Sequence, residues 1–128
     1  MVPESTIREV VESFYARALI HPRLGPVFAE HVPDWSAHLS RLVDFWHSVL
    51  NTSGRYRGRP VPAHQKLPGL DAALFSDWLA LWRSTVREIA DPASAAEMIE
   101  KAERIAQSLA AACLEAESGR PPVFTRVA

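Results

Sequence analysis

His64 is the residue of this chain best placed to bind a metal ion. It closes a loop that Pro60 and Pro62 stiffen, and the apolar residues Leu67 and Leu70 follow it. A neutral imidazole held rigidly beside apolar side chains is typical of an axial ligand of iron. A single histidine in a loop is more often simply solvated, so the loop alone leaves both interpretations open.

His38 is a second histidine that could take part in chemistry, and it lies within a predicted helix. Apolar residues follow it at spacings of four, seven and eight, namely Leu42, Phe45 and Trp46. These spacings return to the same side of a helix, so His38 is expected to point inward with them. His47 falls about 180° away and is expected to point outward. A core histidine that bonds a backbone group explains the same pattern, and both interpretations stay open.

Two hydrogen-bond donors, Tyr15 and Trp78, are expected on the inward faces of two further helices. Tyr15 lies eight residues after Ile7 on an apolar face, and its hydroxyl needs a partner if it is buried. The indole of Trp78 can donate a hydrogen bond but cannot accept one. Ordinary core packing is the better interpretation of each residue taken alone, so the pair does not by itself define a site.

Helices must position these side chains, because apolar residues recur at the 3.6-residue spacing and strand-like alternation is missing. Four helices are predicted, beginning near Thr6, Asp34, Asp71 and Pro92. A capping box from Thr6 to Glu9 is expected to open the first helix. Asp34 and Asp91 are expected to cap the second and the fourth.

The segments between the predicted helices are rich in proline and glycine. Residues 22–28 are expected to form turns, with His21 at the surface beside them. Residues 56–68 hold three prolines and are expected to form a loop with at most one helical turn. The fourth helix is expected to end near Glu117, before Gly119 and two prolines.

The inward faces of the helices follow from the same spacing. For the first helix they are Ile7, Val10, Val11, Phe14, Tyr15 and Ala18. For the third helix they are Leu74, Trp78, Leu81, Trp82, Thr85 and Ile89. For the fourth helix they are Met98, Ala102, Ile105, Leu109 and Ala112. For the second helix they are Trp35, His38, Leu42, Phe45, Trp46 and Val49. Four such faces are sufficient to build an all-α core.

Length and composition indicate one domain, residues 1–128, with a core at about 7–117 and a loose tail at 118–128. The net charge of −1 gives no field that would attract nucleic acid or anionic lipid. No apolar run reaches the roughly 18 residues needed to span a bilayer, so no membrane partner is expected. The single cysteine, Cys113, cannot form an internal disulfide, which favours a cytoplasmic location.

Taken in order, these residues resemble a truncated haemoglobin of the group III branch, from about residue 7 to 115. The resemblance is carried by Tyr15, by Phe28 in Leu-Gly-Pro-Val-Phe, by His38 in Trp-Ser-Ala-His, by the Phe45-Trp46 pair, by His64 after Tyr-x-Gly-x-Pro, and by Trp78. The double-glycine segments of the other groups are absent. The resemblance implies a shortened globin fold, a two-over-two helical sandwich around haem.

The resemblance also implies a role for each residue of the set. His64 would be the iron ligand on the proximal side. Three residues would stabilise a ligand on the distal side, namely Tyr15, His38 and Trp78. Six residues would contact the haem, namely Phe28, Arg41, Leu42, Phe45, Trp46 and Leu67. Because no Cys-x-x-Cys-His is present, haem b would be held without thioether links.

The implied function is binding of dioxygen and other small diatomic ligands by a monomer or weak dimer. Polar donors around a ligand hold it and polarise it. The set therefore favours ligand chemistry, detoxification of nitric oxide or peroxide, or sensing, over transport. Catalysis would need an electron donor, a reductase that the sequence does not identify. The alternative is a haem-free helical interaction module in which the same apolar faces bury one another.

Overall fold

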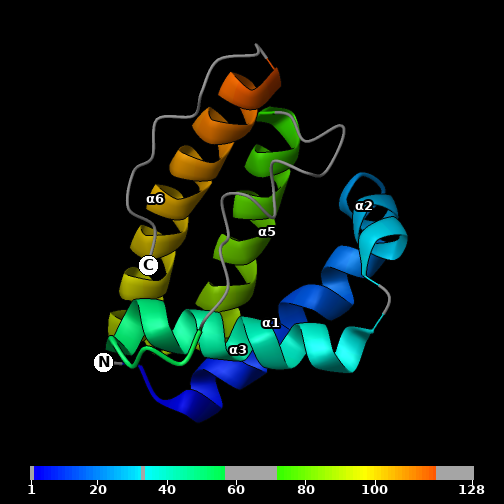
Figure 1. Ribbon diagram of the computed structural model, residues 1–128. Coiled ribbons are helices and arrows are strands. Elements are labelled where there is room, and N and C mark those ends of the chain that lie inside the picture. Colours follow the sequence, from blue (N-terminus) through cyan, green and yellow to red (C-terminus); the bar gives the residue numbers. More distant parts are fainter. Residues whose placement is uncertain (1, 33, 57–71, 118–128) are drawn as a thin grey trace.

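The computed structural model describes residues 2–32, 34–56 and 72–117. Five helices and no strand lie within these ranges: α1 (Glu4–Ile20), α2 (Leu24–His31), α3 (Trp35–Asn51), α5 (Ala72–Ile89) and α6 (Pro92–Glu117). α1 and α3 lie side by side across one end of the α5 and α6 pair (Figure 1). α2 packs on α1 and more lightly on α5. The two pairs form the two-layer sandwich that the resemblance to truncated haemoglobins implies.

The start of α1 differs from the prediction. The helix begins at Glu4 with Pro3 before it, and no side chain caps it, so the expected capping box at Thr6 is wrong. The Ile7 N–H donates to the Pro3 carbonyl at 3.1 Å. Pro3, at φ −59°, already has the backbone angle that suits a helix entry. Burial of the neighbouring Val2 then fixes this early start.

The segment predicted as turns contains a helix, α2, and His21 is half-buried at its start. The His21 Nδ1 accepts hydrogen bonds from the backbone N–H groups of Arg23 and Leu24, at 3.1 and 3.2 Å. These two N–H groups belong to the first helical turn, which has no carbonyl partners of its own. Pro26 fits here because its position in that turn needs no N–H donor. The imidazole thus replaces a conventional cap, which the sequence pattern does not reveal.

α3 begins and ends where the sequence predicts. The Asp34 carboxylate accepts a hydrogen bond from the Ala37 N–H at 3.2 Å, which confirms Asp34 as its cap. The helix stops at Asn51, because Thr52 takes a left-handed conformation with φ 55°. Gly54 also has a positive φ, of 69°, which glycine adopts at little cost.

The junction of α5 and α6 also follows the prediction. The Asp91 carboxylate accepts from the Ser94 N–H at 3.1 Å, and Pro92 is the first residue of α6. All the predicted inward residues of α1 and α6 are buried, including Phe14 and Met98 at 0% exposure. On α5 the buried residues are Leu74, Trp82, Thr85 and Val86. Val86 was not predicted, while Trp78, Leu81 and Ile89 are only half-buried.

Three stacked indoles form the centre of the core. The Trp46 and Trp82 rings lie 4.4 Å apart at 17°, and Trp78 stacks on Trp82 at 5.7 Å and 5°. Phe14 meets Trp82 edge-on at 5.3 Å. The Trp82 indole N–H donates to the Met98 carbonyl at 3.2 Å, so its one polar group is satisfied inside the core. This stack joins α3 to α5 and fixes the orientation of both.

Within the described ranges, no helix is both long and apolar enough to cross a membrane.

Candidate functional site

Aromatic rings from three other helices gather around Tyr15 of α1, which is 6% exposed. Phe28 of α2 meets its ring edge-on at 5.2 Å. His38 and Trp35 of α3 lie at 5.4 and 6.0 Å. Trp78 of α5 hydrogen-bonds the Tyr15 hydroxyl. We call these five residues the Tyr15 cluster.

The hydrogen bond between Trp78 and Tyr15 has a defined donor and acceptor. Because an indole only donates, the Trp78 N–H donates to the Tyr15 oxygen. Burial strongly raises the pKa of Tyr15 and outweighs the opposing effect of the Trp78 hydrogen bond. Tyr15 is therefore a neutral phenol at physiological pH. Its oxygen accepts from Trp78, which leaves its own proton to be donated elsewhere.

His38 stands between two aromatic rings of the cluster. Its imidazole meets Tyr15 at 90° and Trp35 at 89°, both with centroids 5.4 Å apart. The side chain is half-buried. The structure therefore brings together the three residues expected on the distal side, Tyr15, His38 and Trp78. Trp35, three residues before His38 on the same helix face, was not among the predicted site residues, although this spacing could have indicated it.

The predicted haem-contact residues fall into two groups. Phe28 belongs to the cluster, and Leu42, one turn beyond His38, is half-buried against the core. Phe45 and Trp46 lie deeper, at 8% and 2% exposure. Trp46 belongs to the stack of indoles. Phe45 packs edge-on against Tyr56 at 5.1 Å.

Arg41 is exposed on α3, and its charge acts on Tyr56. Burial raises the pKa of the Tyr56 phenol, and the Arg41 charge lowers it by a smaller amount. His47 points away from the cluster, with Nδ1 at 2.7 Å from the Ser53 hydroxyl. His64 and Leu67 lie outside the described residues.

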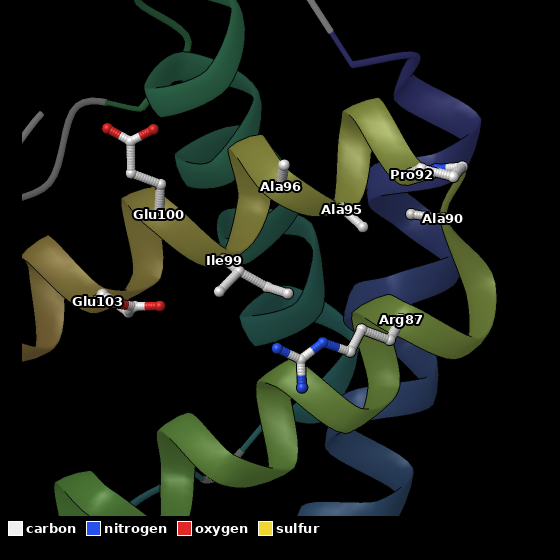
Figure 2. A pocket seen from close by; sticks show the side chains of 8 residues that line it. All are labelled: Arg87, Ala90, Pro92, Ala95, Ala96, Ile99, Glu100 and Glu103. Carbon is white, nitrogen blue, oxygen red and sulfur yellow. The ribbon is translucent and has the colours of Figure 1, made fainter.

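A separate hollow of about 610 Å³ lies between the end of α5 and the start of α6 (Figure 2). Alanines, Pro92 and Ile99 line it, with Arg87, Glu100 and Glu103 as its charged side chains. None of the residues predicted to do chemistry is among them. Since this groove lacks the buried donors of the Tyr15 cluster, the cluster is the better candidate site.

The fold indicates a class of protein. An all-helical two-over-two sandwich, with an aromatic and polar cluster where α1, α2, α3 and α5 meet, has the fold of the truncated globins. No protein-family model matches the chain. A curated relative, group 3 truncated hemoglobin ctb of Campylobacter jejuni, is 25% identical over 109 residues, 82% of this chain and 86% of the relative.

A solved structure gives the same result for the fold. The crystal structure of a group III truncated hemoglobin from Campylobacter jejuni matches with a TM-score of 0.81 and 24% identity. The match covers 86% of this chain and 90% of that chain. The expected resemblance to group III truncated haemoglobins is therefore confirmed, and so is the shortened globin fold.

Proposed function

We propose that this protein binds haem b without a covalent link and takes up dioxygen and other small diatomic ligands beside the Tyr15 cluster. His64 would hold the iron. The observation that carries the proposal is the neutral Tyr15 hydroxyl, buried among aromatic rings and oriented by the Trp78 indole. The name of the curated relative, a truncated hemoglobin, supports the same cofactor.

The residues present fit a haem. Half-buried apolar side chains on three helices lie against the core, namely Phe28, Leu39, Leu42, Phe75 and Leu79. A flat apolar group placed against such side chains would bury them further, which is favourable at about 25 cal/mol per Å² of apolar area. Ligand sites are typically apolar with a small number of placed donors, as Tyr15 and Trp78 would be here.

Bound haem would supply an iron atom that accepts a diatomic ligand. The chain's own contribution is the donor beside that ligand. Tyr15 already accepts from Trp78, so its proton is available for a ligand that carries partial negative charge. His38 adds a second donor or acceptor, depending on its protonation. A hydrogen bond of this kind contributes about 1 kcal/mol or more, and 1.4 kcal/mol corresponds to about a tenfold slower release.

We favour ligand chemistry, detoxification or sensing over transport. A carrier must release its ligand, whereas a preorganised phenol retains and polarises it. A redox reaction would draw electrons from a separate reductase. No observation favours the alternative of a haem-free interaction module.

An absorption spectrum tests the proposal. Purified protein supplied with haem is expected to show a Soret band in the globin region. His64→Ala is expected to lose haem unless imidazole is added, while the matched variant His47→Ala keeps it. A protein that stays colourless after haem supplementation contradicts haem binding. Normal haem retention and an unchanged ferrous spectrum in His64→Ala would contradict only the assignment of the ligand.

A further inference from the structure

α2 is tied to α5 by an ion pair at its first turn. The Arg23 Nε lies 3.2 Å from the Asp77 Oδ2. This oxygen is shielded from solvent and makes no hydrogen bond within the described part of the chain. The Arg23 guanidinium is therefore its nearby countercharge. Because α2 makes fewer contacts with α5 than with α1, the pair is a specific link between α2 and α5.

The same end of α2 is fixed tightly to α1. A Cβ added to Gly25 would lie 2.4 Å from the Leu19 carbonyl oxygen, closer than any side chain could approach. The His21 imidazole also accepts from the backbone at Arg23, which fixes the direction in which α2 leaves α1. The backbone that carries Arg23 is therefore held in place. When Asp77 moves slightly, the start of α2 does not shift with it.

The ion pair lies close in sequence to both partners of Tyr15. Asp77 directly precedes Trp78, which donates to the Tyr15 hydroxyl. Arg23 lies on the helix that carries Phe28, whose ring packs edge-on against Tyr15 at 5.2 Å. Tyr15 therefore contacts a residue of α2 and a residue of α5, the two helices that the ion pair joins.

We propose that the Arg23–Asp77 ion pair holds α2 against α5 and so keeps the Trp78 indole on the Tyr15 hydroxyl. The proposal rests on the proposed function in one respect: it makes Asp77 a positioning residue of the ligand site, acting through Trp78 without touching the ligand. The side chains are 49% and 31% exposed, so dissolved salt can weaken the pair. The hydrogen bond between Trp78 and Tyr15 then depends on ionic strength.

The first test follows the indole protons of ¹⁵N-labelled protein by NMR, with Trp78→Phe used to assign the Trp78 signal. Asp77→Asn is expected to speed solvent exchange of the Trp78 indole proton about two- to fivefold at low salt. High salt is expected to have the same effect on the wild type and no effect on Asp77→Asn. Asp77→Glu keeps the charge and should retain the salt dependence.

The matched control is Glu103→Gln, which removes the ion pair between Arg83 of α5 and Glu103 of α6, 3.4 Å apart. This pair involves α5 but not α2. It should leave the Trp78 proton unchanged. An equal effect of both variants, or no effect of Asp77→Asn, overturns the proposal.

The second test measures the rate of dioxygen release from haem-loaded protein. In Asp77→Asn this rate should rise by the same factor as the exchange rate of the Trp78 indole proton. Failure to bind haem would refute the proposed function and leave the result from the indole protons standing. Unchanged release despite faster indole exchange would show that the pair positions Trp78 without acting on the ligand, which overturns the role of Asp77 at the site.

Discussion

Asn51, the last residue of α3, binds both backbone polar groups of Val2, which lies ahead of α1. Its Oδ1 accepts from the Val2 N–H at 2.8 Å, and its Nδ2 donates to the Val2 carbonyl at 2.8 Å. Val2 is 1% exposed, so its peptide groups have little access to water. Buried backbone groups require partners, and one amide side chain supplies two of them.

Replacing Asn51 with alanine should therefore destabilise the fold. Two buried backbone groups lose their partners, and each such loss costs about 1–3 kcal/mol. Urea unfolding followed by circular dichroism measures the change. Asn51→Asp keeps the accepting oxygen and loses the donor, so its midpoint should fall between those of the wild type and Asn51→Ala. Equal midpoints for wild type and Asn51→Ala would show that the contact carries no stability.

Gly25→Ala should lower stability by about 1–3 kcal/mol and disturb the Tyr15 cluster. The added methyl group would meet the Leu19 carbonyl oxygen, a backbone atom that cannot rotate away. Gly54→Ala is the comparison: it faces open space but has a φ of 69°, so it strains the backbone by about 1–2 kcal/mol without touching the cluster. Near-ultraviolet circular dichroism should change only for Gly25→Ala. The same spectrum in both variants would contradict a tight contact between α1 and α2.

Tyr15→Phe should speed dioxygen release from haem-loaded protein about tenfold or more, since one donor is lost. It should also lower stability by about 1–3 kcal/mol, because the Trp78 N–H is left without its acceptor. Tyr56→Phe removes the hydroxyl of a tyrosine that packs against Phe45 outside the cluster, and it should leave release unchanged. Stopped-flow mixing measures both rates. If release is the same in wild type and Tyr15→Phe, the phenol does not face the ligand.

Acid should selectively weaken the start of α6. The Ser94 hydroxyl and then its backbone N–H bond the Asp91 carboxylate and lower its pKa below the ordinary value of 3.8. A lowered pKa means that the ionised cap stabilises the fold above pH 3.8, and that this contribution is lost as pH falls through the lower value in the folded state.

Asp91→Asn is the matched variant for this prediction, because its amide oxygen still caps the helix but does not titrate. The difference in unfolding midpoint between wild type and Asp91→Asn should be constant above about pH 5 and shrink below pH 3.8. A difference that does not change with pH would show that Asp91 contributes nothing through its charge.

Several features of this protein could be predicted from the sequence because they depend on neighbours along the chain. The inward face of α1 is set by apolar spacing, and every predicted residue of it, from Ile7 to Ala18, is buried. Asp34 and Asp91 cap their helices through backbone groups only three residues away. The ordered set of aromatic residues and histidines also indicated the truncated globin fold.

Other features depended on a distant contact or on an unusual helix cap, and they could not be predicted in this way. α1 begins early because Asn51, 49 residues away, holds Val2. α2 forms because an imidazole replaces the usual cap and because Gly25 lies against the end of α1. No standard sequence pattern marks either feature, and the proline and glycine between residues 22 and 28 suggest turns when taken alone.

The features of the candidate site also fall into two groups, those set by local spacing and those set by the packing of the helices. Spacing alone placed Tyr15, His38 and Trp78 on inward faces, because the face of a helix is a local property. That Trp78 donates to Tyr15, and that Phe28 and Trp35 complete the cluster, was decided by the angles at which α1, α2, α3 and α5 cross. Trp78 and Tyr15 are 63 residues apart in the sequence, so only the packing of the helices brings them together.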